Sequence, residues 1–352
     1  MKSPLHRLAL VATLVAFAVI VLGAYVRLSH AGLGCPDWPG CYGQLTWPAE
    51  AHEVTRAEQA FPERPVETHK AWKEMVHRYL AGFLVLLVVA INVLAWRGPH
   101  SDTAHRATRV RGLAAILLVL ILFQAALGMW TVTLKLKPII VMGHLLGGLA
   151  TFGLLLWLTW RSGSKRTAAG PRPLARWRAL ILTSLAVLIL QLALGGWTSA
   201  NYAALACPDF PVCQGQLWPA TDFGEAFVLW REIGVDYEGG VLDLPARTAI
   251  HLAHRIGALA ALLVLGLLAV GLLRAPALRR EGAALVVLLG AQILLGIQNV
   301  VLHLPLLNAA AHNGTGALLL AMLLWLVYRS SPAPSHTVAR SVARAVPGAG
   351  GG

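Results

Sequence analysis

Charged residues are scarce in this sequence. Only 13% of its 352 residues are Asp, Glu, Lys or Arg, whereas 57% are hydrophobic. A soluble domain carries about 25% charged residues, so a chain of this composition cannot cover itself with polar surface. The shortage of charge excludes an ordinary soluble protein and predicts a membrane protein.

A concentrated basic patch is also missing, although the formal net charge is +13. The basic residues lie in short connections between apolar runs rather than in one cluster. Proteins that bind nucleic acid gather lysine and arginine on one face. The charge pattern therefore excludes a nucleic-acid partner and leaves membrane lipid as the chain's surroundings.

Apolar runs of about 20 residues, long enough to cross a bilayer, recur along the chain. The eight runs lie near 8–28, 76–96, 113–133, 139–160, 178–198, 249–273, 283–302 and 307–328. Lys2, His6 and Arg7 precede the first run, as in a signal peptide. A similar internal run at 178–198 favours a retained helix instead. The tail at 331–352 is rich in Pro, Ala and Gly, which predicts disorder.

Basic residues mark the connections that stay in the cytoplasm. The connections near 97–112, 161–178 and 274–281 are rich in arginine and lysine, whereas the long loops near 29–72 and 199–247 are richer in acidic residues. We therefore expect a multi-pass protein of a plasma membrane, with both termini cytoplasmic and the two long loops outside.

The chain is an internal duplication. "CPDWPGC" in the first long loop returns as "CPDFPVC" in the second, and "EMVHR" from Glu74 corresponds to "HLAHR" from His251. The pairs Gln124/Gln292, Gly128/Gly296 and His144/His312 align at a constant offset of 168. Each copy holds four helices, so both enter from the same side. We expect an all-α fold of two tandem, pseudo-twofold-related four-helix bundles, at 1–165 and 166–330.

The chain has only four cysteines, and all of them lie in the long outer loops. Each pair brackets a five-residue spacer with two prolines, which favours the disulfides Cys35–Cys41 and Cys207–Cys213 in an oxidising compartment. Each bridge is either a structural staple or a redox-active pair. A zinc site would require all four thiols to converge across both loops.

Four histidines occupy duplicated positions in the first two turns of helices that enter from outside: His77, His144, His254 and His312. Ionisable groups inside a membrane are costly and point to function. A lone histidine is more often a hydrogen-bonded packing residue, but four in one shared register favour a ligand set. Two facing imidazoles in a bundle can hold a heme iron axially, and the glycines beside His144 and His312 leave room for a flat macrocycle.

Three further residues distinguish or flank these histidines. Arg78 and Arg255 directly follow two of them, which favours pairing with heme propionates or snorkelling toward lipid headgroups. Glu74 stands one helical turn before His77, and its counterpart is His251, so an acid–base role is expected in the first half only. The E-x-x-H spacing also occurs in di-iron bundles, but these need a second such motif and further embedded glutamates.

Over about residues 8–328, these motifs resemble the heme A synthases of respiratory bacteria. The resemblance implies oxidation of a ring methyl of heme O to the formyl group of heme A, for cytochrome c oxidase. It implies that His254 and His312 hold a permanent heme b. It also implies that His77 and His144 flank the substrate heme, with Glu74 close to the reacting edge.

The same resemblance implies a place and partners. Cys35 and Cys41 correspond to cysteines that serve heme transfer or reduction, and the presence of Cys207 and Cys213 indicates the branch with both pairs. The setting is the bacterial inner membrane, with the cysteine loops periplasmic. Heme O synthase, cytochrome c oxidase assembly factors and a thiol–disulfide reductant are the expected partners.

Two functions of other classes also account for four histidines. A bis-heme b electron carrier fed by quinol would bind two equivalent hemes, and it leaves the Glu74/His251 difference unexplained. A heme transporter or chaperone would need no electron source. The hemes extracted from the protein distinguish all three functions.

Overall fold

Helices make up nearly all the regular structure of the chain, seen in a computed structural model that describes residues 3–97, 104–163 and 173–331. Within those ranges, eight helices are long and apolar enough to cross a membrane. They are α1 (Pro4–Leu28), α3 (Thr68–Arg97), α4 (Ala104–Thr133), α5 (Pro138–Gly163), α6 (Arg178–Ala200), α8 (Leu244–Arg274), α9 (Arg279–Val301) and α10 (Leu306–Ser330). The predicted all-α class with eight spans is confirmed, and the chain is a multi-pass membrane protein.

Helices α3 and α8 begin earlier than hydropathy predicts. They start at Thr68 and Leu244, eight and five residues before the expected apolar runs. A 30-residue helix is about 45 Å long, more than the roughly 30 Å of hydrocarbon, so its first turns stand above the lipid, where polar residues are tolerated. The expectation that His77 and His254 lie in the first two turns is therefore wrong, because both lie in the third.

The outer loops contain short helices that the apolar pattern does not predict. In α2 (Ala51–Ala60), the Glu53 carboxylate accepts the N–H of Glu50 at 3.1 Å, and α7 (Phe223–Ala226) starts at the capping side chain of Asp222. The 3-10 turns η1 (Ala175–Trp177) and η2 (Pro276–Leu278) lead into α6 and α9. The predicted disorder beyond residue 331 and the predicted bundle boundary at 165 lie outside the described residues.

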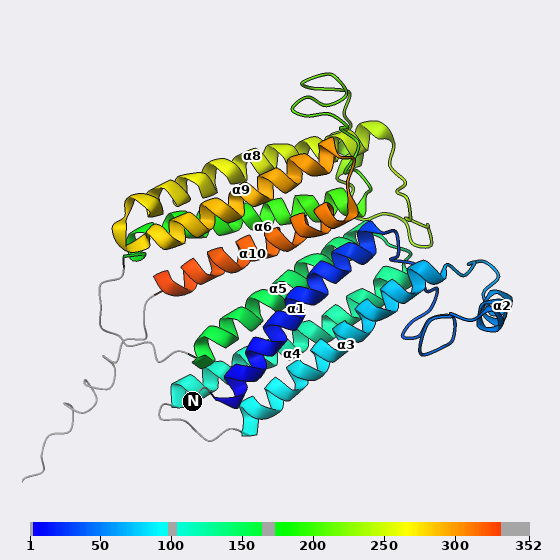
Figure 1. Cartoon of the computed structure of the whole chain (residues 1–352), viewed down its shortest axis with the longest axis horizontal. Coiled ribbons are helices and arrows are strands. Elements are labelled where there is room, and N and C mark those ends of the chain that lie inside the picture. Colours follow the sequence, from blue (N-terminus) through cyan, green and yellow to red (C-terminus); the bar gives the residue numbers. More distant parts are fainter. Residues whose placement is uncertain (1–2, 98–103, 164–172, 332–352) are drawn as a thin grey trace, which may run out of the picture.

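The membrane helices gather into two groups that follow the order of the sequence (Figure 1). In the first group, contacts form a closed ring in which α1 touches α3 and α5, and α4 touches the same two helices. In the second group, α6 and α9 each touch α8 and α10. Between the groups, α1 packs on α10, and α5 packs on both α6 and α10. The pseudo-twofold relation between the groups stays a prediction.

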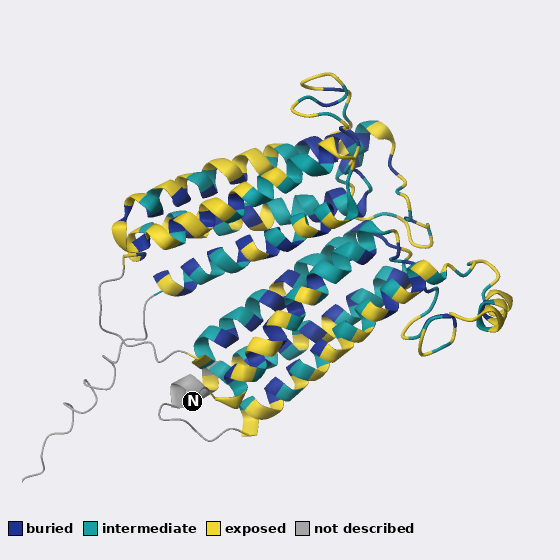
Figure 2. Ribbon diagram, in the orientation of Figure 1, coloured by how far each residue is buried: buried dark blue, intermediate teal, exposed yellow. Residues whose placement is uncertain are grey.

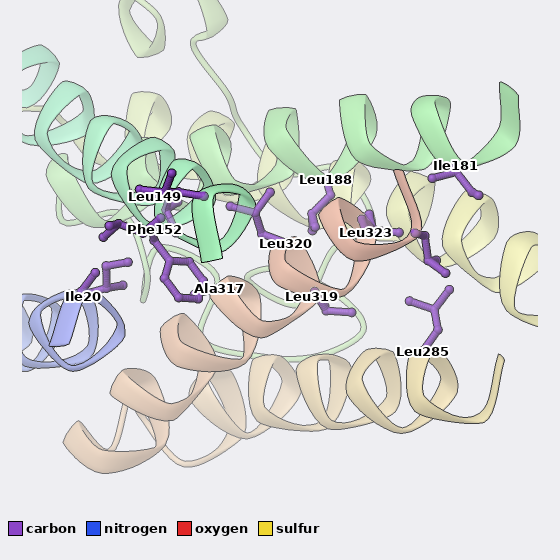
Figure 3. Close-up of a cluster of buried hydrophobic side chains, with 14 of the residues drawn as sticks. Ile20, Leu149, Phe152, Ile181, Leu188, Leu285, Ala317, Leu319, Leu320 and Leu323 are labelled. Atoms are coloured by element: carbon purple, nitrogen blue, oxygen red, sulfur yellow. The ribbon is translucent and has the colours of Figure 1, made fainter. Parts of the chain in front are cut away.

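Apolar and aromatic side chains fill the junction between the two groups. Figure 3 shows Ile20 of α1, Phe152 of α5 and Ala317 of α10 in one cluster of buried side chains. Near the other end of the junction, the ring centroids of Trp160 and Trp325 lie 5.2 Å apart. Exposed residues, drawn in yellow in Figure 2, lie on helix surfaces turned away from this core. They include the apolar residues Leu14, Leu86, Val119, Leu190, Leu263 and Val287, as expected for surfaces that face lipid.

The duplication extends to unusual backbone conformations. Positive φ angles occur at the matched pairs His30/Tyr202, Tyr42/Gln214, Lys135/His303 and Leu136/Leu304. The peptide bonds Trp38–Pro39 and Phe210–Pro211 are both cis. Non-glycine residues seldom adopt positive φ, so matched exceptions show that both copies keep the same loop geometry and not only a similar sequence.

Candidate functional site

In the first half, each of the two predicted histidines packs against a glycine of a neighbouring helix. A Cβ added to Gly23 of α1 would lie 2.9 Å from Cε1 of His77, which belongs to α3. A Cβ added to Gly128 of α4 would lie 3.3 Å from Cε1 of His144, which belongs to α5. A larger residue at either position would press on the ring, so these glycines leave the space in which the imidazoles pack.

The second half repeats this arrangement. A Cβ on Gly195 of α6 would lie 3.1 Å from Cε1 of His254, and a Cβ on Gly296 of α9 would lie 3.1 Å from Cε1 of His312. Gly23 and Gly195, which precede the long outer loop of their half, were not among the residues singled out from the sequence. The offset of 172 that relates the two cysteine motifs also relates these two glycines, and this offset could have identified them.

The two histidines of each half come from two different helices of the same group, His77 with His144 and His254 with His312. All four side chains are half-buried. Within each ring of four contacting helices, the two histidines belong to helices that lie across the ring from each other, α3 and α5 in the first half and α8 and α10 in the second. This is the placement expected for two axial ligands on opposite sides of one planar group.

The ring nitrogens of the four histidines differ in their hydrogen bonds. The Nδ1 atoms of His77 and His144 are buried and lack hydrogen-bond partners among the described residues. The Nδ1 of His312 lies 3.1 Å from the backbone oxygen of Gln292. A proton on Nδ1 that is donated to a carbonyl is the arrangement that metal-ligating histidines commonly use. Nε2 of His312 lies 3.2 Å from Nε2 of the Gln292 side chain, so this amide has to turn away when Nε2 binds a metal.

Other metal centres find less support in the described part of the chain. There, no group of three or more His, Cys, Asp or Glu side chains could hold a metal ion. Structural zinc requires four protein ligands and a di-iron centre requires several carboxylates. Two imidazoles suffice for a heme, because the macrocycle supplies the remaining ligands.

Glu74 joins helix α3 to the first cysteine loop. One carboxylate oxygen accepts the backbone N–H of Cys35 at 3.0 Å, and the other accepts from the Arg78 guanidinium at 2.5 Å. The Glu74 side chain is buried. A buried carboxylate is tolerated when it is paired and hydrogen-bonded, and both conditions hold here.

Arg78 completes the same attachment. Its Nη1 donates to the backbone oxygens of Asp37 at 2.9 Å and Pro39 at 3.3 Å, and also to that of Gly40. Backbone carbonyls near a membrane need partners, because lipid offers none. Arg78 supplies them for the turn of the first cysteine loop.

The second half uses different chemistry for the same attachment. His251, the counterpart of Glu74, accepts the backbone N–H of Cys207 on Nδ1 at 3.2 Å. Arg255 donates to the backbone oxygens of Val212 and Asp209, each at 2.8 Å. The proposed pairing of Arg78 and Arg255 with propionates stays a prediction, and their contacts to the loop carbonyls were not foreseen.

Both cysteine pairs are closed as the sequence predicts. The S–S distances are 2.07 Å for Cys35–Cys41 and 1.97 Å for Cys207–Cys213. In the second loop, the backbone N–H groups of Gly215 and Gln214 donate to the Asp209 carboxylate, which lowers the pKa of this carboxyl below its usual value. Asp37 makes the same two contacts in the first loop. The bridges and the aspartates together stabilise two matching turns at 35–44 and 207–216, called the cysteine hairpins below.

Contacts near the outer ends of the helices also connect the two halves. Arg27, at the end of α1, donates to the backbone oxygen of Ser199 at 2.7 Å and lies 4.0 Å from the ring centroid of Tyr202. Arg64 in the first loop donates to the Glu238 carboxylate in the second loop at 2.5 Å. Arg27 corresponds to Ser199 at the repeat offset of 172, so these two unequal counterparts contact each other directly.

Comparison with known proteins gives a consistent family assignment. A family model described as cytochrome oxidase assembly protein matches residues 6–324. A heme A synthase of Shewanella oneidensis is 48% identical, and the alignment covers 92% of this chain and 95% of that protein. Heme A synthases of Rhizorhabdus wittichii and Caulobacter vibrioides are 30% and 27% identical, over 90% and 89% of this chain and 91% and 92% of theirs.

Proposed function

This chain belongs to the cytochrome oxidase assembly protein family, and we propose that it is an oxidoreductase that converts heme O to heme A. The observation that carries the proposal is the pair of histidines on opposite helices of each half, with every ring packed against a glycine. This arrangement suits a planar iron macrocycle in each bundle. The relatives named heme A synthase support the same activity.

The two halves bind different hemes. His77 and His144, in the half formed by residues 1–165, hold the substrate heme O. His254 and His312, in the half formed by 166–330, hold a heme b that stays with the protein. The Glu74/His251 difference supports this division, because a carboxylate next to only one pocket suits chemistry at that pocket alone.

Bound heme supplies the redox-active iron for oxidation of the ring methyl to a formyl group. His77 and His144 fix the plane of the substrate, and the bordering apolar helices receive its farnesyl tail. Glu74 stands one helical turn before His77 and accepts a proton on a carboxylate oxygen or stabilises positive charge that develops near it. Arg78 and Arg255 balance the propionates while they hold the loops.

The charge distribution along the sequence favours an inner-membrane protein with both termini in the cytoplasm. The cysteine hairpins then lie in the periplasm, where disulfides persist and a thiol–disulfide reductant can reach them. Heme O synthase is the natural supplier of the substrate, and assembly factors of cytochrome c oxidase receive the product.

Extraction and chromatography of the hemes in the purified protein test this function. A synthase yields heme b together with heme O or heme A. An electron carrier yields two equivalents of heme b. Variants with each histidine replaced by alanine assign the sites, because loss of heme b should follow His254 and His312 only. A colourless protein from heme-rich cells would reject the proposal.

A further inference from the structure

Gln191 of α6 lies against the ring of His254. Its side-chain Nε2 is 3.1 Å from Nδ1 of His254 and 3.0 Å from the backbone oxygen of the same residue. Its Oε1 is buried and has no partner among the residues that the structure describes. A Cβ added to Gly257 would lie only 2.2 Å from this Oε1. The amide therefore occupies a space that a glycine leaves open.

The first half replaces both members of this arrangement. At the repeat offsets of 172 and 177, Val19 corresponds to Gln191 and Leu80 corresponds to Gly257. Where the second half has an amide and a glycine, the first half has two apolar side chains. Nδ1 of His77 is buried and unpartnered within the described ranges. Among the residues that the structure describes, a side chain hydrogen-bonds to the ring of His254 but none is seen at Nδ1 of its equivalent His77.

We infer that Gln191 is a positioning residue that fixes His254 for lasting ligation of the second-half heme, and that Val19 and Leu80 leave His77 free to release its ligand. The inference rests on the proposed function, because that function requires one retained heme and one exchanged heme. Outer-sphere partners of metal-ligating histidines fix both the ring orientation and the position of its proton.

The amide has the atom that this role requires. Ligation through Nε2 puts the imidazole proton on Nδ1, so Nδ1 then needs an acceptor rather than a donor. A half-turn of the Gln191 amide exchanges its nitrogen and oxygen, which ordinary structures do not distinguish. Oε1 then accepts the Nδ1 proton of His254. In this orientation the amide gives up its bond to the backbone oxygen of His254, Nε2 takes the buried place that Oε1 had, and Oε1 gains the Nδ1–H of His254 as its partner.

The test gives the His254 site the apolar side chains that lie at the equivalent positions beside His77. The double variant Gln191→Val with Gly257→Leu should lose heme b to excess apomyoglobin about 10–100-fold faster than the wild type, since outer-sphere substitutions weaken metal binding by such factors. Its low-spin electron paramagnetic resonance signal should broaden as the His254 ring loses its fixed orientation. Leu190→Val, on the exposed side of the same helix, should change neither measurement.

Two single variants keep the test decisive if the double variant folds poorly. Gly257→Ala should displace the amide without removing it and should speed heme loss. Gln191→Glu keeps an acceptor for the Nδ1 proton, so it should retain heme b and lower its midpoint potential. Wild-type rates and signals in Gly257→Ala and in the double variant would overturn the inference. A wild-type protein that contains no heme b would instead overturn the proposed function.

Discussion

Replacing Glu74 by histidine separates two roles of this carboxylate, because the second half already has a histidine at the same place. Glu74 and His251 both accept a backbone N–H from the first cysteine of their loop, at 3.0 Å and 3.2 Å. A histidine at position 74 should therefore keep the loop attached. The substitution removes the carboxylate charge and little else.

The contacts give the size of the effect. Complete removal of the acceptor by Glu74→Ala leaves the buried N–H of Cys35 unpaired, at about 1–3 kcal/mol. It also breaks the ion pair with Arg78, and breaking a buried pair costs about 3–5 kcal/mol. Arg78 keeps its bonds to loop carbonyls, so we expect a total near the lower values, about 3–4 kcal/mol. Glu74→His should cost less, about 1–2 kcal/mol, because the histidine still accepts the N–H of Cys35 and can also accept from Arg78, as His251 does from Arg255 at 3.3 Å.

The assay is heme analysis of cells that supply heme O, combined with thermal unfolding of the purified variants. Glu74→His should unfold near the wild-type temperature, retain heme b, accumulate heme O and make little heme A. Glu74→Gln should also stop conversion, whereas the reciprocal His251→Glu should still convert heme O. Normal heme A production by Glu74→His would show that the carboxylate only anchors the loop, and would refute its role in the chemistry.

Other predictions concern the surroundings of the site. Gly23→Ala should press on His77 and weaken heme O binding several-fold in spectral titrations, while heme b content is unchanged; equal loss of both hemes would contradict this. Arg255→Ala should free the second hairpin, so its disulfide should be reduced and alkylated faster, as measured by mass spectrometry. Arg64→Ala should lower stability by about 1 kcal/mol, with a smaller effect at high salt; an effect independent of salt would rule out the ion pair. The Asp209 carboxyl has a lowered pKa, so its contribution to the hairpin should persist above its unfolded-state pKa and disappear only as the pH falls through the lower folded value; limited proteolysis across acidic pH measures this.

The helices and their duplication were predictable from the sequence because each depends on a strong local signal. A span requires about 20 apolar residues in a row, and the two copies still share Gln124/Gln292 and His144/His312 in register. The histidine sets followed from that register, since a shared position reveals a shared environment. Helix starts were less predictable, because hydropathy detects lipid contact and the helices extend beyond it.

Contacts between a loop and a helix were not predictable in the same way. Arg78 follows a histidine that faces the bundle, and its sequence position suits a heme propionate, a lipid headgroup or a loop carbonyl equally well. Its observed partners exist because the cysteine hairpin folds back over α3. The sequence around Glu74 likewise contains no sign of Cys35, which lies 39 residues earlier in the chain.

The differences between the copies are informative because the backbone around them is the same. The paired positive φ angles show that both halves hold their loops alike, so Glu74 and His251 stand in equivalent places. The matched contacts of Gly23 with His77 and of Gly195 with His254 place Val19 and Gln191 alike as well. An arrangement that served one task twice would have no need for unequal residues beside equivalent histidines. The unequal residues add a carboxylate near the first site and a ring-fixing amide at the second. One half is thereby suited to act on a heme and release it, and the other half is suited to keep one.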